Sequence, residues 1–449
     1  MLFYPKLNRH ILFPIAEKLY KSSVLKHYRF LKKSEWWSRE QIEKFRDERL
    51  ALLVNHVYKN VPYYHDLFDS EKLKPAHIKT YYDLEKIPIL TKDLMKDNYD
   101  KLISLDSDRR IRKCHSTGGS TGKVFQYITD IEAWNSAWAS TFRAWDNCGL
   151  NFGEKILTIG GQSLVSNQKL LSKKDIWEKI LLRNYKYSCS KMDYEDILKF
   201  CKTFIRMKPS AIRGFPSSIY VVAKFIKEHG LEIPKIKCVL TTGEVLLPEY
   251  RETMQEVFKV PVYDNYGAGD GGIHTHECFM HNGFHISEED CILEICHQGK
   301  RLPNGEIGSV IATDLNNYVF PFIRYEVGDM ASIKETLCSC GRKTKLIEEV
   351  VGRLGRVIYS KNGVATSPTM LDAFLFKDLD WDNEINQKIY NNIDKFQVVQ
   401  DSFGDIEIRL KMLDKYKEED YQYIIQNYES FMEGTKAKLI FVDEIKALP

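Results

Sequence analysis

A run of glycines and hydroxyl residues has the composition of a phosphate-binding loop. It follows the strand-like residues 111–114 and ends in a lysine. Glycines let backbone N–H groups turn towards an anion, hydroxyls add donors, and the lysine supplies positive charge. The run comprises Ser116, Thr117, Gly118, Gly119, Ser120, Thr121, Gly122 and Lys123. It is not a P-loop, because Val124 stands where Ser or Thr must follow the lysine. A flexible connector is the alternative, which the pattern alone leaves open.

Three further glycine turns carry carboxylates. Residues 241–244 and 264–270 each follow a predicted strand, and residues 324–329 place an aspartate after a third turn. The carboxyl ends of parallel strands are where α/β proteins bind ligands. A carboxylate there can accept hydrogen bonds from ribose hydroxyls, and Arg353 adds a guanidinium further along the chain. Each turn is a weak signal alone, but together they indicate a nucleotide site.

Cysteine and histidine residues suggest a second site. Cys338 and Cys340 lie two residues apart, and Cys278, His281 and His285 precede them. Three thiolates and one imidazole suit a closed, tetrahedral zinc site of structural type. The spacing leaves open which histidine completes the set, and buried free thiols are the alternative interpretation.

Short β-rich runs alternate with longer helical patterns through the middle of the chain, which predicts βαβ units and a mostly parallel sheet. The predicted strands are residues 155–160, 211–214, 238–242 and 260–264, and the predicted helices are residues 131–147, 194–207, 217–229 and 248–258. Residues 35–105 are typical of an α-helical cap, and residues 284–333 of a β-rich subdomain. The tail predicts strands at 396–399, 406–410 and 438–442 with a charged helix at 415–432.

Composition limits the function classes. With 449 residues, 43% hydrophobic and 28% charged, the chain is globular and too long for one ordinary core. A net charge of +3 argues against a nucleic-acid-binding protein. The ten cysteines follow no disulfide framework, and no run approaches the ~18 apolar residues of a spanning helix. We expect a cytoplasmic protein in a reducing compartment.

The first 33 residues are strongly basic, with eight lysines and arginines against the single acid Glu17. Apolar residues recur there at helical spacing: Leu12, Ile15, Ala16, Leu19 and Tyr20. The segment is either an amphipathic helix in peripheral contact with an anionic membrane or a helix packed on the main domain with a solvated basic face. Pro14 interrupts the pattern.

The motifs in this order resemble those of the adenylate-forming superfamily of acyl-activating ligases. Within it they resemble the phenylacetate–coenzyme A ligase branch, which includes capsular-polysaccharide biosynthesis proteins. Residues 116–123 match the phosphate loop, and residues 266–270 match a tyrosine-glycine-x-x-glutamate motif. Residues 317–329 resemble the stretch that leads to a ribose-binding aspartate, and residues 396–409 and 438–445 resemble a mobile C-terminal domain.

The resemblance implies that ATP activates a carboxylic acid as an acyl-adenylate, after which an amine or a thiol, coenzyme A included, accepts the acyl group. Besides the phosphate loop, it assigns nucleotide binding to Gly243, Glu244, Asn265, Tyr266, Gly267, Asp329 and Arg353. Tyr266 would stack on adenine, and Asp329 with Arg353 would hold the ribose. Asp270 and Lys123 are the expected catalytic residues, with Asp270 facing Mg²⁺. The resemblance also favours His285 over His281 as the zinc ligand.

Three departures from the family pattern affect these expectations. Asp270 replaces a glutamate and is one methylene shorter, and Arg353 is not followed by the aspartate that marks the family's hinge. The family's adenylating lysine follows the final strand in a serine-glycine-lysine turn, whereas this sequence reads to Pro449 without one. We expect either a chain shortened before that turn, which the final Leu-Pro favours, or a nucleotide-binding protein with impaired adenylation.

The expected architecture is α/β, with three parts. These are an α-helical cap of the large domain (1–105), a nucleotide- and substrate-binding α/β core with a β-rich subdomain (106–352), and a small α+β domain (353–449). The expected function is a ligase of surface (capsular or O-antigen) polysaccharide biosynthesis, and an aryl-acid–coenzyme A ligase is the nearest rival. The acid, the acceptor and the oligomeric state stay open.

Overall fold

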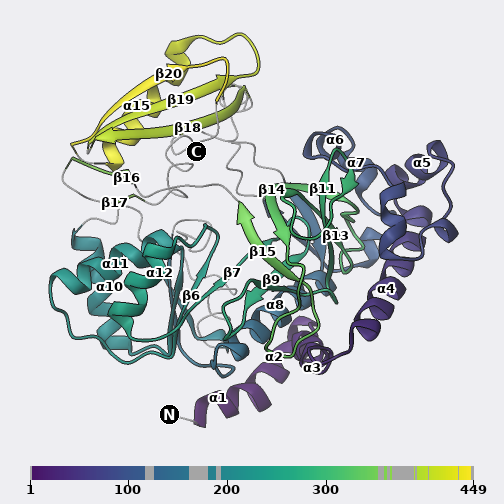
Figure 1. The fold of residues 1–449 in the computed structure, drawn as a ribbon, viewed down its shortest axis with the longest axis horizontal. Coiled ribbons are helices and arrows are strands. Elements are labelled where there is room, and N and C mark those ends of the chain that lie inside the picture. The colour runs from purple at the N-terminus through teal and green to yellow at the C-terminus, as the bar shows by residue number, and fades with distance from the viewer. Residues whose placement is uncertain are drawn as a thin grey trace. The chain divides into compact units, whose positions relative to one another are not determined.

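A computed structural model of the chain describes most of its length (Figure 1). It describes residues 3–116, 126–160, 181–188, 194–351, 358–361, 365–366, 389, 392–402, 404–432 and 434–445. The chain divides into two compact units. The first is Met1–Thr117, Gln126–Glu154 and Tyr263–Arg353, and the second is Gly118–Phe125, Lys155–Val262 and Leu354–Pro449.

Helices dominate the N-terminal part of the first unit, as the sequence predicts. They are α1 (Phe3–Leu7), the π-turn η1 (Asn8–Leu12), α2 (Phe13–Tyr20), α3 (Val24–Ser34), α4 (Arg39–Asn60), α5 (Pro62–Ser70), α6 (Lys92–Asp97), α7 (Tyr99–Leu102) and α8 (Ile131–Asn147). A capping box begins α4, because Ser38 and Gln41 each accept the other's backbone N–H. Pro14 does not break the first helical run: it lies at the start of α2, directly after the π-turn η1.

An eight-stranded antiparallel sheet forms the rest of the first unit. Its order is β12-β11-β13-β14-β15-β10-β9-β8. The strands are β8 (Gly267–Ala268), β9 (Ile273–Glu277), β10 (Phe284–Ile286), β11 (Cys291–His297), β12 (Lys300–Arg301), β13 (Gly308–Asp314), β14 (Tyr325–Ile333) and β15 (Leu346–Val351). Ile273, Ile295 and Ala312 are among its buried residues. This sheet is the predicted β-rich subdomain.

The second unit contains the predicted parallel sheet. Its order is β4-β3-β5-β6-β7. The elements are β3 (Ile156–Gly160), β4 (Asn184–Ser188), α10 (Tyr194–Met207), β5 (Ala211–Gly214), α11 (Pro216–Glu228), β6 (Cys238–Thr242), α12 (Pro248–Phe258) and β7 (Val262–Asn265). Helices α10, α11 and α12 lie together (Figure 1), and their apolar faces supply Phe200, Phe225 and Met254 to the core.

The C-terminal residues form a small α+β layer with its own core. Strands β18 (Ile393–Ser402) and β19 (Asp405–Met412) are antiparallel, and β20 (Lys436–Phe441) lies parallel to β19. The predicted helix is shorter than expected, because its first part is a 3₁₀ turn, η6 (Glu418–Tyr421), before α15 (Gln422–Phe431). A short pair, β16 (Ile358–Tyr359) and β17 (Ala365–Thr366), precedes this layer in the chain.

The described cysteines are all free thiols. Most are buried, as expected of core residues, but Cys114, on β1 (Arg112–Ser116), is exposed, so the sequence interpretation was wrong there. Cys189 lies outside the described residues. Among the described helices, none combines the length and the apolar character needed to cross a membrane.

Candidate functional site

Two tyrosine–aspartate pairs join the predicted nucleotide motifs. The hydroxyl of Tyr266 donates to Asp329, with 2.9 Å between the oxygens, and the hydroxyl of Tyr325 donates to Asp270 at 3.1 Å. The pairing is reciprocal, because each segment contributes one tyrosine and one aspartate. Three residues selected from sequence therefore lie in one cluster. Tyr325 was not selected, although it follows the arginine of the predicted motif.

The backbone around Tyr266 is held in place by Thr275 on β9. The Thr275 hydroxyl donates to the Tyr266 carbonyl at 2.7 Å, and the Tyr266 N–H donates to the same hydroxyl at 3.2 Å. The amide of Asn265 donates to the Thr275 carbonyl. The ring of Tyr266 is therefore positioned by the sheet rather than by a loose turn.

The carboxylate of Asp270 is half-buried, and its environment favours the neutral form. Burial raises the pKa of Asp270, and the hydrogen bond from Tyr325 partly offsets this shift. Nearby, Gly272 has a φ of +66°, and a Cβ at this position would lie 2.5 Å from the Asp314 carboxyl carbon. Any other residue at this position would force its neighbours to shift, so the turn that follows Asp270 requires glycine here.

The predicted phosphate loop is attached to a described hairpin. Strands β1 and β2 (Gln126–Asp130) pair antiparallel, with Ser116 opposite Gln126. The side chain of Ser116 and the residues from Thr117 to Lys123 lie outside the described part of the chain, as does Arg353. The structure thus locates where the loop leaves and rejoins the sheet.

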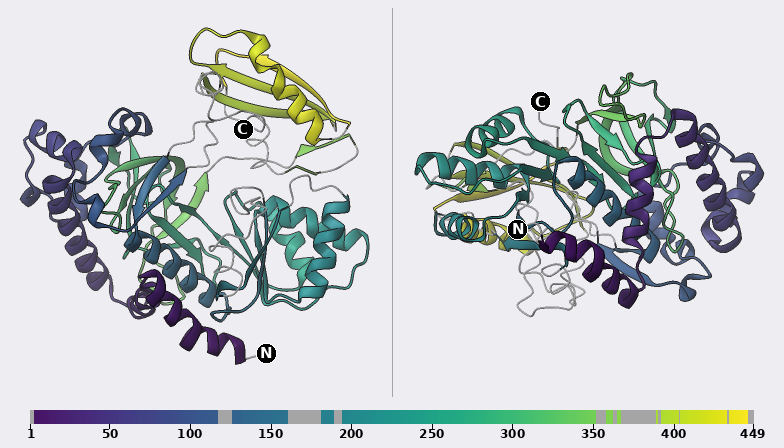
Figure 2. Two further views of the ribbon diagram at one scale, coloured as in Figure 1. Left: turned by 180° about the vertical axis from the view of Figure 1, so that it is seen from behind. Right: turned by 90° about the horizontal axis from the view of Figure 1, so that it is seen from below.

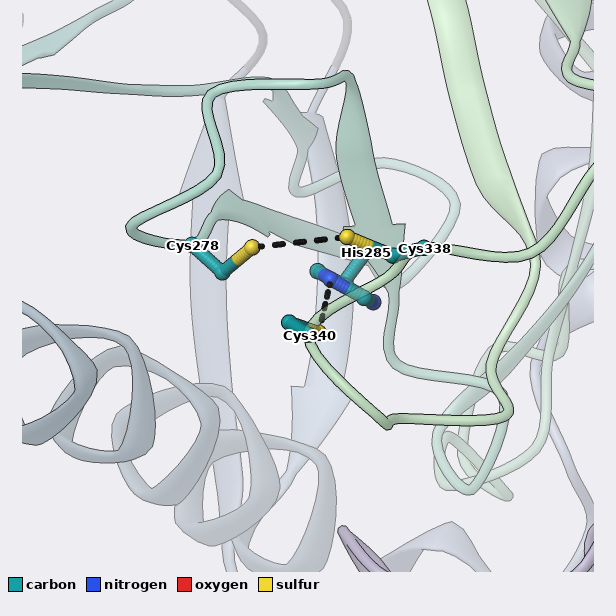
Figure 3. Close-up of side chains that lie close together, drawn as sticks. All are labelled: Cys278, His285, Cys338 and Cys340. Carbon is teal, nitrogen blue, oxygen red and sulfur yellow. Dashed lines mark hydrogen bonds between the residues drawn. The ribbon is translucent and has the colours of Figure 1, made fainter.

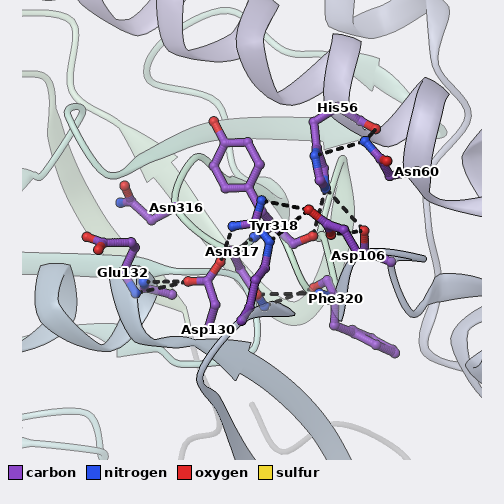
Figure 4. Close-up of polar contacts among 12 residues, drawn as sticks. His56, Asn60, Asp106, Asp130, Glu132, Asn316, Asn317, Tyr318 and Phe320 are labelled. Carbon is purple, nitrogen blue, oxygen red and sulfur yellow. Dashed lines mark hydrogen bonds and ion pairs between the residues drawn. The ribbon is translucent and has the colours of Figure 1, made fainter. Parts of the chain in front are cut away.

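Asp130 anchors this hairpin at its far end (Figure 4). One carboxylate oxygen accepts the N–H groups of Glu132 and Ala133, which caps α8, and the other accepts the N–H of Tyr318 at 3.1 Å. The Asn317 amide donates to the carbonyls of Ile128 and Phe320, both at 2.9 Å. Strand β2 is thereby fixed to the loop that precedes β14. Sequence reasoning missed Asp130, although an aspartate directly before a helical pattern is an N-cap signal.

His56 extends the same polar cluster from helix α4 (Figure 4). Its Nε2 lies 2.9 Å from the Tyr318 carbonyl oxygen, and its Nδ1 lies 3.2 Å from the Asn60 amide nitrogen. Burial lowers the pKa of His56, which favours a neutral ring. We read this histidine as a structural link between α4 and the Tyr318 loop.

Gly243 and Glu244 lie in the second unit. Gly243 has a φ of +81°, and the Glu244 carboxylate accepts the N–H of Ser217 at 3.1 Å. Ser217 is the second residue of α11, so the carboxylate lies at a helix N-terminus, where negative charge is favourable. This contact gives Glu244 a structural role that its sequence motif did not indicate.

A compact cysteine–histidine cluster lies in the first unit (Figure 3). Its members are Cys278, His285, Cys338 and Cys340, whose ligand atoms all lie within 4.8 Å of one another. The Cys278 and Cys338 sulfurs are 3.7 Å apart, and the Cys340 sulfur is 3.4 Å from Nε2 of His285. A tetrahedral zinc with the usual bond lengths places two sulfurs about 3.8 Å apart and a sulfur and a nitrogen about 3.6 Å apart. The donor set therefore fits zinc.

Strand geometry brings these four residues together. Cys278 follows β9, His285 lies on the neighbouring β10, and the two later cysteines occupy the connection between β14 and β15. The Thr344 hydroxyl lies 2.9 Å from Nδ1 of His285, which orients the ring with Nε2 towards the sulfurs. His281, the alternative ligand, instead contacts the Glu277 carboxylate at 3.2 Å and is not part of the cluster.

The cluster has an asymmetric electrostatic environment. Burial raises the pKa of Cys278 to about 12, and burial lowers that of His285 to about 4. The pKa of Cys340 is lowered in spite of burial, because Arg342 donates hydrogen bonds to it and adds positive charge. Arg342 in turn pairs with the buried Glu35 at the end of α3. The neutral imidazole and the stabilised thiolate are the forms that bind a metal.

Comparison with known proteins agrees with this architecture. No protein-family model matches the sequence. Protein CapK of Staphylococcus aureus is 23% identical over 410 residues, which cover 88% of this chain and 86% of that protein. The phenylacetate-coenzyme A ligase of Aromatoleum evansii is 25% identical over 358 residues, covering 76% of this chain and 77% of the relative.

Solved structures share the fold. 2-Hydroxyisobutyryl-CoA ligase, in complex with 2-HIB-AMP and CoA in the thioesterification state, has a TM-score of 0.63 at 17% identity. The match covers 93% of this chain and 90% of that structure. The chain is therefore similar in sequence to Protein CapK and the phenylacetate-coenzyme A ligases and shares the fold of a solved acyl-CoA ligase, in agreement with its resemblance to the adenylate-forming superfamily of acyl-activating ligases.

Proposed function

We propose that this ligase uses ATP to activate a carboxylic acid as an acyl-adenylate and then passes the acyl group to an amine or a thiol. The observation that carries the proposal is the reciprocal pairing of Tyr266 with Asp329 and of Tyr325 with Asp270. It sets an aromatic ring and two carboxylates side by side. An aromatic ring can stack on adenine, and carboxylates can accept hydrogen bonds from ribose hydroxyls or bind a phosphate-bound cation.

In this proposal Tyr266 stacks on adenine and Asp329 accepts hydrogen bonds from the ribose, with Arg353 contributing a guanidinium. The hydrogen bond between the two side chains supports these roles, because it holds the carboxylate at the edge of the ring. The loop from Ser116 to Gly122 would donate N–H and hydroxyl groups to the phosphates, and Lys123 would add positive charge. The register of β1 and β2 supports a loop that is fixed at both ends.

Asp270 is proposed to face Mg²⁺, in the role that the family gives to a glutamate. When bound, Mg²⁺ neutralises phosphate charge as the acid attacks the α-phosphate and pyrophosphate leaves. The Tyr325 hydroxyl would orient the shorter Asp270 side chain. A cation beside Asp270 would also favour the ionised carboxylate, against the burial that raises its pKa.

We also propose that Cys278, His285, Cys338 and Cys340 hold a structural zinc ion. The support is the fit of the sulfur and nitrogen separations to tetrahedral coordination. Four protein ligands leave no open position, so the role would be to stabilise the first unit rather than to catalyse.

The biological setting proposed is the assembly of a surface polysaccharide, with transfer of an acyl group or amino acid to a sugar amine. The resemblance to capsular-polysaccharide biosynthesis proteins supports it, and Protein CapK matches 88% of the chain. Transfer to coenzyme A is the second candidate, which the names of the phenylacetate-coenzyme A ligase relatives favour.

A two-stage assay separates these functions. Pyrophosphate release is first measured with ATP and a panel of aryl acids, uronic acids and amino acids. Any acid that releases pyrophosphate is then offered coenzyme A or an amino sugar, and the acylated product is identified by mass spectrometry. Acylated amino sugar supports the polysaccharide setting, whereas acyl-coenzyme A alone supports the second candidate. ATP binding without acid-dependent pyrophosphate release would leave only a nucleotide-binding protein.

A further inference from the structure

A line of large apolar side chains lies exposed on the first helical run. Ile11 is 50% exposed, Ile15 55% and Leu19 75%. They follow one another at intervals of four residues, so they lie along one side of a helix. Figure 2 shows α1, η1 and α2 as consecutive turns of a single rod, which makes the line continuous. An apolar stripe of this kind is unfavourable in water and marks an interaction surface.

The opposite side of the same rod is firmly packed within the first unit. Phe13 is 1% exposed and meets the rings of Phe142 and Phe152 at centroid distances of 6.0 and 4.8 Å. Asn8 and Ala16 are buried as well. Because this side is anchored to the unit, the helix cannot rotate to bury Ile15 and Leu19. The apolar line is therefore a fixed feature of the surface.

The same region of the chain carries an excess of exposed positive charge. The exposed basic residues of this region are Lys6, Arg9, Lys18, Lys21, Lys26, Arg29 and Lys33. The single acid, Glu17, is turned inward and accepts the N–H of Leu25 at 2.7 Å. Lys32 is the exception among the basic residues, because it pairs with Glu35 and Asp146. The region thus offers exposed apolar side chains together with an excess of exposed cations.

This combination selects one kind of partner. A second copy of the chain would bring the same surface into the contact, and its positive charges would oppose each other. An anionic lipid surface complements both features, since acyl chains accept the apolar line and lipid phosphates attract lysine and arginine. We propose that η1 and α2 dock on an anionic membrane, with Ile11, Ile15 and Leu19 entering the boundary between headgroups and acyl chains.

Co-sedimentation of the full chain with lipid vesicles tests this proposal. We expect binding to vesicles of phosphatidylglycerol and phosphatidylcholine in equal parts, weak or no binding to pure phosphatidylcholine, and loss of binding as salt rises. The double variant Ile15→Ser/Leu19→Ser is expected to lower the partition coefficient by about tenfold or more, because two large apolar contacts are removed. Leu105→Ser is the matched control, since Leu105 is also 75% exposed but lies outside this helical run.

Four outcomes would overturn the proposal. One is no binding to the anionic vesicles, and another is equal binding by the wild type and the double variant while both melt at the same temperature. The third is a concentration-dependent dimer in sedimentation velocity that the double variant abolishes, which would assign the surface to a second copy of the chain. An equal loss of binding in the Leu105→Ser control would show that the effect is not specific to this surface.

Discussion

Replacing Cys338 by serine is expected to remove the zinc ion and to destabilise the first unit. Cys338 is 6% exposed, and its sulfur lies 3.7 Å from that of Cys278. A ligand bound only to the folded state stabilises it by about 4 kcal/mol when its free concentration is a thousand times the dissociation constant. Burial raises the pKa of Cys278, so without metal this side chain is a neutral thiol. The variant therefore carries no additional cost from an unpaired buried thiolate at Cys278. The expected cost is therefore about 4 kcal/mol, or a fall in Tm of about 5–10 °C.

The assay combines metal analysis by mass spectrometry with scanning calorimetry on protein purified without chelators. Wild type is expected to carry one zinc per chain, whereas Cys338→Ser and His285→Ala carry little and melt earlier. His281→Ala is the matched control, because His281 contacts Glu277 and lies outside the cluster. Zinc-free wild-type protein would refute the reasoning. A loss of zinc in His281→Ala with retention in His285→Ala would refute the choice of ligand.

Three other variants test different parts of the structure. Asp329→Ala is expected to weaken ATP binding, measured by titration calorimetry, by about 1.5–3 kcal/mol. Tyr266→Phe keeps the ring but loses the hydroxyl, and it is expected to weaken ATP binding by about 0.5–1.5 kcal/mol. Unchanged ATP affinity in both variants would contradict the ribose assignment. Arg324→Met removes one of the two arginines that pair with the buried Glu294, at 3.2 Å, while Arg301 stays at 2.8 Å. The variant is expected to cost about 1.5–3 kcal/mol in urea unfolding, the range for a hydrogen bond to a charged group, and a change within about 0.5 kcal/mol would exclude this role. Burial raises the pKa of Asp314 to about 7, so its contribution to stability falls as pH rises from about 4 to 7. The stability of Asp314→Asn relative to wild type should therefore rise between about pH 4 and pH 7, and a difference in stability that does not depend on pH would refute the raised pKa.

Elements that depend on local sequence signals could be predicted closely. The helices Ile131–Asn147, Tyr194–Met207 and Pro248–Phe258 have the predicted bounds, as do the strands Ala211–Gly214 and Cys238–Thr242. Apolar periodicity and proline at the start of a helix are properties of neighbouring residues, so they are readable without a structure. The same holds for the β-β-α-β order of the tail, although η6 shortens its helix.

Contacts between distant segments could not be read in this way. Tyr325 and Asp270 are 55 positions apart in the sequence, and the Asp130–Tyr318 contact spans 188. Arg324 was grouped with the nucleotide motif, but it is buried and donates to the Ile87 carbonyl at 2.8 Å, so it supports the fold. Such pairings depend on strand order and register, which spacing along the chain does not encode.

The central claim is that the site around Asp329 transfers AMP from ATP to a carboxylic acid. Its most direct test is mass spectrometry of the products formed from ATP and the acid panel by wild type and by Asp329→Ala. The account predicts acyl-adenylate and pyrophosphate in the presence of at least one acid, with a marked reduction in the variant. Acid-dependent formation of ADP and inorganic phosphate, with no acyl-adenylate from any acid, would contradict it, because the reaction would then occur at the γ-phosphate.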